Sequence, residues 1–378
     1  MSTARTTTAI KGRHTAPARP AGQPESLKPP SISHANPKDS MKSTWRRQNR
    51  SEWTIYHWFY ELLGIHPTHL DRHIPIHQKT DKVPHMHERS LHSWVLLHAF
   101  IPILLQHLYV TWTGRNFTAL QAFFFYSAAY KLIAIHELHI LRRLGHNIGF
   151  LDGDAHERDG IPDVGVSKVV FSLVSTSTFR PIATVFLSYR YSQAPADMNW
   201  LWLPLEAGLY GIILDFWFYW YHRLMHEVGS LWQYHRTHHL TKHPNPLLTL
   251  YADSEQEFFD ILGIPLLTYF SMKAMGMPMG FYEWWIGHQY VVFAELAGHS
   301  GLRLHTSPPN LLNPLLQWFK CELIIEDHDL HHRKGWKTSG NYGKQTRLWD
   351  VVFGTCKDRI ECQDDNIDWE NTVSMPLF

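Results

Sequence analysis

The sequence predicts an all-α protein in which membrane helical hairpins carry a histidine-rich helical cap on the cytosolic side. Hydrophobic residues make up 44% and aromatic residues 14% of the 378 residues, whereas charged residues make up only 18%. This balance indicates a large apolar core or a membrane. The mean hydropathy of −0.27 argues against a simple bundle of apolar spans. The 28 histidines are the compositional outlier, and they cluster in segments between the apolar stretches.

Residues 1–50 differ from the rest of the chain, with ten Lys/Arg, two Asp/Glu and many Ser, Thr and Pro residues. So polar a segment cannot bury enough apolar surface to offset the entropy of ordering it. It lacks the apolar region of a secretory signal, and its prolines oppose the amphipathic helix of a mitochondrial transit peptide. We therefore favour a disordered cytosolic tail close to anionic lipid over mitochondrial targeting. We expect residues 1–90 to form this basic tail and an amphipathic lead-in.

Six apolar stretches of near-spanning length follow, and they pair into three helical hairpins. They occupy residues 93–112, 118–135, 166–189, 200–220, 258–275 and 281–298. Arg180-Pro181 predicts that the third stretch is broken or lies at the interface. The alternative for all six is a buried core helix of a soluble protein. His98, His107 and His288 lie within them, and polar groups are expensive in lipid.

The histidine-rich segments all fall on one side of these hairpins. They cover residues 141–165, 222–257 and 299–378, and they hold many Lys/Arg residues, which the positive-inside rule assigns to the cytosol. Three cysteines at no ligand-like spacing imply no disulfide framework and fit a reducing compartment. We expect a hairpin with its loop at 91–165, a histidine-rich domain at 166–357 and a tail at 358–378.

Three histidine clusters stand out in that domain. Each is spaced so that its imidazoles share one face of a helix. The eight members are His222, His226, His235, His238, His239, His328, His331 and His332. So many neutral imidazoles on three such faces indicate metal binding, because a metal binds the neutral ring. One ion uses three or four histidines, so eight predict two ions, although imidazole alone does not choose between iron, zinc, copper and nickel.

The clusters HRLMH (222–226), HRTHH (235–239) and HDLHH (328–332) resemble the histidine boxes of the fatty acid hydroxylase/sterol desaturase superfamily. The stretch NYGKQTRLWDVVFGT (341–355) resembles the ending of that family. The resemblance covers about 205–355, and it identifies the domain at 166–357 as the catalytic domain.

The resemblance implies a multi-pass enzyme of lipid biosynthesis in the endoplasmic reticulum membrane, with two Fe ions on the cytosolic side. Such an enzyme uses O2 to hydroxylate or desaturate an unactivated C–H bond of a sterol or fatty acyl lipid. Its electrons come from NAD(P)H through cytochrome b5 or a related reductase, so the implied partners are a lipid substrate, the membrane and a redox protein. The ligands it implies are the eight clustered histidines.

A ninth ligand is implied by AELAGHSG, in which His299 resembles a histidine of the sterol-modifying branch. This match favours a sterol slightly over a fatty acyl chain, a sphingoid base or a fatty aldehyde. Glu295 precedes His299 by four residues, so both can face the metals.

Asp215 lies two helical turns before His222 and shares its face. We expect its carboxylate to accept a hydrogen bond from a ligand imidazole. The alternative is a cap or an ion pair with Arg223 or Arg236.

Other residues near the boxes carry weaker expectations. Asp327 and Asp329 flank His328 and invite the same interpretation as Asp215. Spare ligand candidates are His243, His288 and His305. The HExH at 136–139 lacks the HExxH spacing of a zinc protease, so we interpret it as structural or interfacial.

Two other functions remain open from the residues alone. A zinc-dependent membrane hydrolase would need a general base such as Glu227 or Glu295, but it does not need so many histidines. A non-catalytic protein that binds metal or lipid would keep the same fold. A nucleic-acid role has little support, because the basic tail lacks interleaved aromatic residues.

Overall fold

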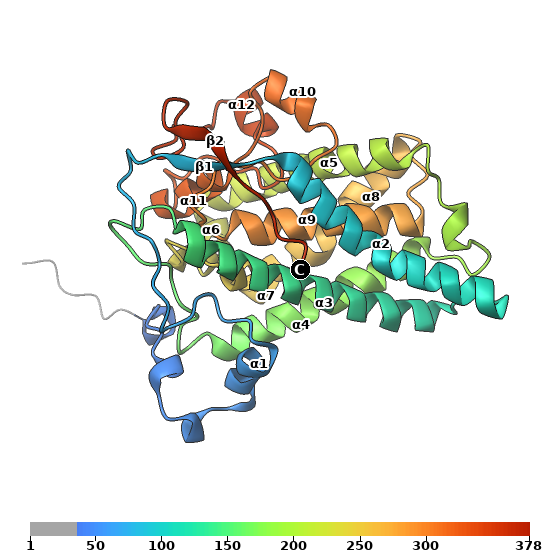
Figure 1. The fold of residues 1–378 in the computed structure, drawn as a ribbon, viewed down its shortest axis with the longest axis horizontal. Coiled ribbons are helices and arrows are strands. Elements are labelled where there is room, and N and C mark those ends of the chain that lie inside the picture. Colours follow the sequence, from blue (N-terminus) through green and yellow to red (C-terminus); the bar gives the residue numbers. More distant parts are fainter. Residues whose placement is uncertain (1–35) are drawn as a thin grey trace, which may run out of the picture. The chain divides into compact units, whose positions relative to one another are not determined.

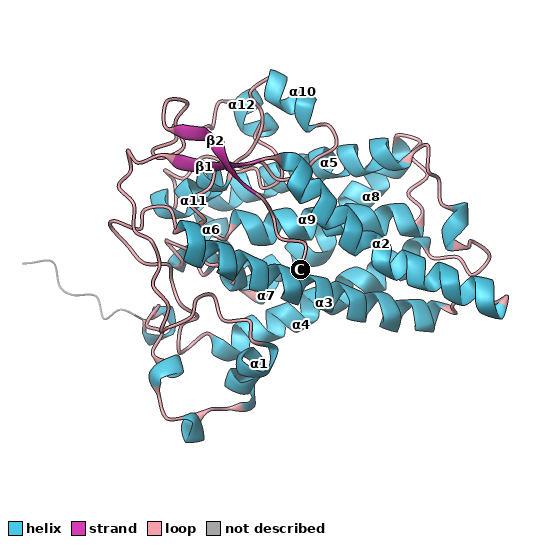
Figure 2. Cartoon of the chain, viewed as in Figure 1, coloured by secondary structure: helices cyan, strands magenta, loops and turns pink. Residues whose placement is uncertain are grey.

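Helices form nearly all of the regular structure in the computed structural model, which describes residues 36–378 (Figures 1 and 2). Residues 38–378 form one unit. Its long helices are α2 (Glu88–Thr113), α3 (Ala119–Ile148), α4 (Val166–Ser188), α5 (Leu203–Glu227), α8 (Ile264–Ala274) and α9 (Phe281–Gly298). All six predicted apolar stretches are therefore helical.

Shorter elements connect the long helices and close the histidine-rich end. The short α-helices are α1 (Ile55–Leu63), α6 (Gly229–His235), α7 (Ser254–Phe258), α10 (Asn313–Trp318), α11 (Ile325–Lys334) and α12 (Leu348–Phe353). The 3₁₀ turns are η1 (Pro37–Asp39), η2 (Trp45–Arg47), η3 (Arg50–Glu52), η4 (Pro195–Asp197), η5 (His238–Leu240) and η6 (Pro246–Leu250), and η7 (Phe259–Gly263) is a π-helix.

Helix α9 is the core of the unit. It contacts α2, α3, α4, α5 and α11, and Figure 1 shows it between α2, α5 and α8. Every residue from Phe281 to Leu296 is buried. A helix that is apolar on all sides needs neighbours on all sides, so α9 matches the core-helix alternative considered for the apolar stretches.

Helices α2 and α4 are long and apolar enough to cross a membrane, judged by length and composition. Their large apolar side chains are also exposed at several positions. Trp112 of α2 is 88% exposed and Phe186 of α4 is 85% exposed. Exposed apolar surface on this scale marks an interaction site with lipid or protein.

The expected break at Arg180-Pro181 is wrong, because α4 runs unbroken from Val166 to Ser188. A proline removes the N–H that would bind the carbonyl four residues earlier, which here belongs to Ser177. Lys131 of α3 donates to that carbonyl at 2.8 Å. The freed acceptor is therefore satisfied from outside the helix, and α4 continues through Pro181.

Part of the segment that we expected to be disordered is folded, and the rest of that prediction (residues 1–35) lies outside the described residues. Trp45 is 1% exposed, and its indole donates to the Ile161 carbonyl at 3.1 Å. The Asp163 carboxylate accepts from the backbone N–H groups of Thr44 and Trp45. The free energy gained by burying the Trp45 side chain thus helps to order this segment despite its polar composition.

Two short strands that are far apart in the sequence pair with each other. Strand β1 (Val83–Met86) pairs in parallel with β2 (Ile367–Val373), and Val83 lies opposite Ile367. Figure 2 shows the pair beside α11 and α12. Neither strand alternates between buried and exposed positions, so neither has the pattern by which a strand is predicted from sequence.

Candidate metal centre

All nine predicted histidine ligands come together at the polar ends of the helices. His222 and His226 lie one turn apart at the end of α5, and α6 and η5 carry the next three. His299 is the C-cap of α9. Helix α11 presents the last three. All nine side chains are buried.

The nine imidazoles form two groups, and within each group the ligand atoms lie within 4.8 Å of one another. The first group consists of His222, His226, His235, His239 and His331, and the second of His238, His299, His328 and His332. Three contacts between Nε2 atoms measure 2.9 Å (His222 to His235), 3.0 Å (His239 to His235) and 3.0 Å (His328 to His299).

Main-chain carbonyl groups fix which nitrogen carries the proton in five of the nine rings. The Nδ1 atoms of His222, His226 and His331 donate to the carbonyl oxygens of Tyr342, Trp336 and Gly340 at 2.8, 2.8 and 2.7 Å. In the second group, His299 donates to Glu295 O and His332 donates to Thr241 O at 2.8 and 2.9 Å. A carbonyl can only accept, so Nδ1 holds the proton and Nε2 keeps its lone pair.

This tautomer makes the donor set suitable for metal ions. Burial lowers the pKa of His226 to about 4 and that of His299 to about 4, so these rings are neutral at neutral pH. His222 and His235 face each other with unprotonated Nε2 atoms 2.9 Å apart, because Nδ1 of His235 donates to the Gln256 side-chain oxygen at 3.0 Å. Two such lone pairs repel each other unless a cation lies between them. The residues therefore fit two ions, one in each group.

The spare histidine candidates lie outside both groups. His243 contacts the Asp152 carboxylate at 2.9 Å, and His288 contacts the hydroxyl groups of Thr184 and Tyr210. His305 contacts His85. In the HExH segment, His136 and His139 contact main-chain carbonyl groups of residues 377 and 63.

The expected hydrogen bond between Asp215 and a ligand imidazole is wrong. Its buried carboxylate accepts instead from the backbone N–H groups of Lys344, Gln345 and Thr346 at 2.7, 3.1 and 3.1 Å, and from the Thr346 hydroxyl at 2.8 Å. Three successive N–H groups attract a carboxylate more strongly than one imidazole does. Asp215 thus anchors the loop at residues 344–346. This loop follows directly on Tyr342 and Gly343, and the Tyr342 carbonyl orients His222.

The same expectation for Asp327 and Asp329 is also wrong, because arginines compete for both carboxylates. Asp327 pairs with Arg359 at 2.8 Å, and Asp329 pairs with Arg158 and with Arg333. Both carboxylates therefore bind arginine side chains around α11 and do not contact the histidines of that helix.

Glu295 acts through its main chain as well as its side chain. Its carbonyl accepts from His299, as described above. Its carboxylate forms two hydrogen bonds to Arg180, at 2.9 and 3.1 Å, and one to Lys344 at 2.9 Å. The ammonium group of Lys344 also lies 3.9 Å from the centre of the Phe218 ring. This buried ion network leaves no pattern in the sequence, because its members are more than 40 residues apart.

Neither of the two glutamates considered as a hydrolytic base is free to act as one. Glu227 pairs with Arg223 at 2.8 Å and is part-exposed. Glu295 is held by two cations.

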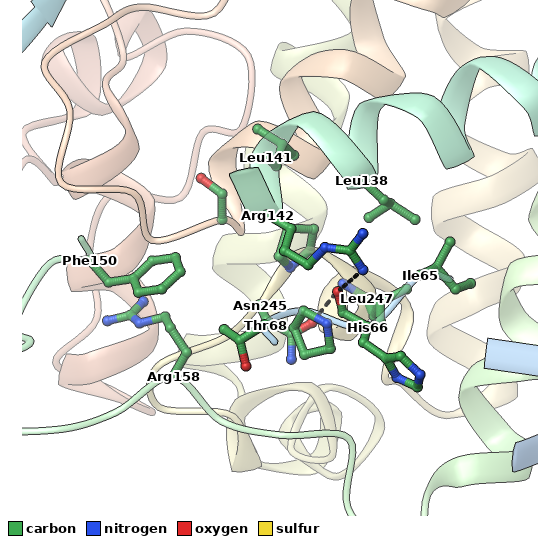
Figure 3. A pocket seen from close by; sticks show the side chains of 13 residues that line it. Ile65, His66, Thr68, Leu138, Leu141, Arg142, Phe150, Arg158, Asn245 and Leu247 are labelled. Carbon is green, nitrogen blue, oxygen red and sulfur yellow. Dashed lines mark hydrogen bonds between the residues drawn. The ribbon is translucent and has the colours of Figure 1, made fainter. Parts of the chain in front are cut away.

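A small cavity lies next to this centre, beside Ser300, which follows His299 (Figure 3). Figure 3 shows Arg142, Phe150, Arg158 and Asn245 around it. Its volume of about 10 Å³ accommodates roughly one water molecule and not a lipid.

The sequence profile of the family described as Fatty acid hydroxylase matches residues 207–355. The chain is 44% identical over 316 residues to the Fatty acid hydroxylase vlmA of Lecanicillium sp, covering 80% of this chain and 86% of that protein. It is 28% identical over 204 residues to the alkylglycerol monooxygenase of Homo sapiens, covering 50% of this chain and 39% of that one. It is 29% identical over 168 residues to the methylsterol monooxygenase 2-1 of Arabidopsis thaliana, covering 42% and 58%. The chain thus spans most of the first relative and less than two thirds of the other two. No solved structure matches.

Proposed function

Because this chain belongs to the fatty acid hydroxylase family, we propose that it is an O2-dependent membrane oxidoreductase that hydroxylates or desaturates an unactivated C–H bond of a lipid at two iron ions. The observation that carries the proposal is the pair of histidine groups with nine buried imidazoles, five of which main-chain carbonyl groups orient. Bound iron would supply the activation of O2 that attack on such a bond requires.

The protein's own residues would hold and shape this centre. Carbonyl groups of the segment 336–342 keep three Nδ1 protons in place, so that three Nε2 lone pairs point inward. Asp215 fixes the following residues, and the Arg180–Glu295 pair fixes the end of α9. Rigid support of this kind keeps ligands in the geometry that a metal needs.

We propose a fatty acyl lipid as the first substrate class to test. The 44% identity to a protein named as a fatty acid hydroxylase, over most of both chains, supports this choice. The HSG sequence at His299 and the methylsterol monooxygenase relative favour a sterol as the second class.

The proposed setting is the endoplasmic reticulum membrane, with the metal centre on the cytosolic side. Exposed apolar side chains on α2 and α4 support a membrane position. The proposed domains are a membrane hairpin with its loop at residues 91–165, a catalytic domain at 166–357 and a tail at 358–378. Electrons would come from NAD(P)H through cytochrome b5 or a reductase.

The zinc hydrolase alternative has less support than the oxidoreductase, because both candidate bases are held in ion pairs. A non-catalytic role is opposed by the complete set of nine buried imidazoles.

Metal analysis of detergent-purified protein tests the proposal first. We expect about two irons per chain, the number that two histidine groups can hold. The variant His238→Ala/His331→Ala, which removes one ligand from each group, should lose them. The exposed His156→Ala variant should keep them. Absence of iron from the wild type, even after reconstitution, would overturn the di-iron proposal.

Product analysis tests the reaction. Iron-loaded protein in lipid vesicles, supplied with a reductant and ¹⁸O2, should incorporate one ¹⁸O atom into a hydroxylated lipid. Parallel vesicles with a fatty acyl lipid or a methylsterol separate the two substrate classes. A product without isotope and without a new double bond would contradict both oxidative outcomes.

A further inference from the structure

An exposed aromatic and basic surface lies directly outside the first histidine group. It consists of Lys242, Lys334, Trp336 and Lys337, all exposed, and we call it the Trp336 surface. Trp336 is 40% exposed, although large aromatic rings are usually buried. The Lys337 ammonium lies 4.8 Å from the centre of the Trp336 ring. Lys242 approaches from another segment, since a β-carbon at Gly335 would lie 2.6 Å from its Nζ atom.

A stack of rings leads from this surface to the metal ligands. The Trp336 and Trp232 rings are stacked, with centres 5.6 Å apart and planes 21° apart. Trp232 in turn lies 5.2 Å from the ring of His226 and 5.5 Å from that of His239. Both histidines belong to the first group. The path from solvent to the ligands is therefore a continuous series of ring contacts.

A second connection joins the same residues through the backbone. The Trp336 carbonyl accepts the hydrogen bond from Nδ1 of His226 at 2.8 Å. Trp336 is thus linked to one ligand both through its main chain and, by way of Trp232, through its ring. A substitution of the Trp336 side chain removes the ring route and leaves the carbonyl in place.

In the part of the chain that the structure describes, the route through Trp232 is the shortest ring route from the ligands to an exposed ring. A route through Tyr342 and Tyr219 reaches Trp220, and one through Phe218 and Tyr221 reaches Phe259, but each has two rings between the ligand and the exposed ring instead of one. The non-histidine rings within contact of the nine ligands belong to Phe218, Tyr342 and Trp232. Phe218 and Tyr342 are buried, with exposures of 7% and 3%. Trp232 is the ring among them that is not buried, and it stacks against the exposed Trp336.

We propose that the Trp336 surface is the docking site of an acidic one-electron carrier protein, and that Trp336 and Trp232 conduct its electrons to the metal centre at His226 and His239. The proposal rests on the proposed oxidoreductase function. Hydroxylation follows R–H + O2 + 2 e⁻ + 2 H⁺ → R–OH + H2O, so each turnover needs two electrons and two deliveries from a one-electron carrier. Lys337 at the exposed ring, Lys242 beside Gly335 and the exposed Lys334, two residues before Trp336, supply the charge that attracts an acidic partner.

Binding to metal-free, full-length protein in detergent tests the docking step. The probe is the haem domain of a cytochrome b5 with net negative charge, and the measurement is its Kd at low and high salt. Lys334→Glu/Lys337→Glu should weaken binding by about tenfold or more at low salt and flatten the salt dependence. The matched control Lys82→Glu/Lys320→Glu reverses two exposed lysines elsewhere and should bind as the wild type does. Equal weakening by both pairs would overturn the assigned surface.

Stopped-flow oxidation of the reduced carrier by iron-loaded protein tests the conduction step. At saturating carrier, Trp336→Leu should slow carrier oxidation by about tenfold, whereas Trp336→Phe, which keeps a ring, should restore most of the rate. Dithionite, which needs no docking, should reduce all the variants equally. A wild-type rate in Trp336→Leu at saturation would overturn the route. A wild type that holds no iron would contradict the proposed function, while the binding measurement on metal-free protein would still decide the docking site.

Discussion

Arg180 of α4 and Glu295 of α9 form a buried ion pair through two hydrogen bonds of 2.9 and 3.1 Å. Lys344, from the segment after the last histidine box, joins the same carboxylate at 2.9 Å. Because the main chain of Glu295 also orients His299, this pair connects a helix with exposed apolar surface to the second histidine group.

Replacement of Glu295 by Gln should destabilise the protein strongly. The variant leaves Arg180 and Lys344 buried without a counter-charge, and breaking a buried pair in this way costs about 3–5 kcal/mol. Thermal unfolding in detergent, followed by tryptophan fluorescence, should show a markedly lower Tm. Glu255→Gln, at an exposed glutamate, is the control. A Tm equal to that of the control would show that the pair contributes little.

Replacement of Asp215 by Asn should loosen metal binding while the protein stays folded. One carboxylate oxygen becomes an NH2 group that faces backbone N–H donors, which costs about 1–3 kcal/mol locally. The loop at 344–346 then shifts, and the Tyr342 carbonyl no longer orients His222. Iron should dissociate faster into a chelator than it does from Asp364→Asn, an exposed control. Unchanged iron release would mean that the loop keeps its position without the carboxylate.

The two histidine groups should lose their ions independently, because they share no residue. His239→Ala, in the first group, and His332→Ala, in the second, should each retain about one iron per chain. Mass spectrometry of the metal content measures this directly. Loss of both ions from either single variant would show that the groups bind cooperatively.

The metal-free protein should lose stability as the pH falls from about 6.5 to about 4. Burial lowers the pKa of His226 and of His299 to about 4 in the folded state, whereas an unfolded histidine titrates near 6.5. Between these values the unfolded chain binds more protons than the folded one, so the free energy of unfolding decreases with falling pH. Below about pH 4 the contribution of these two groups levels off.

Denaturant unfolding at several pH values checks this expectation. His226→Gln should reduce the slope between pH 6.5 and 4, because one titrating group is removed. His156→Gln, at an exposed histidine, should keep the slope. An equal slope in wild type and His226→Gln would contradict the buried-histidine explanation.

The sequence predicted the helical stretches, and its eight clustered histidines come together with His299 in the structure, for a physical reason. Imidazoles at spacings of three and four necessarily share a helix face, and the apolar stretches necessarily fold as buried or lipid-facing helices. Family resemblance added His299, which has no cluster of its own.

The residues that orient the histidines could not be predicted in the same way. Carbonyl groups of Tyr342, Trp336 and Gly340 are present in any sequence, so they leave no pattern. Asp215 was expected at a histidine because both share a face of α5, but the N–H groups that it binds lie about 130 residues away. The continuity of α4 depends on Lys131 from another helix, which no local rule for proline includes.

The pairing of β1 with β2 places a condition on the order in which this protein is built. Residues 83–86 emerge from the ribosome early, but their partner strand is synthesised some 280 residues later. The carbonyl groups that orient three histidines also lie after all the ligands, at residues 336–342. The centre can therefore take up its ions in final form only after residue 342 has been synthesised, and until then the apolar helices must fold without a complete metal centre.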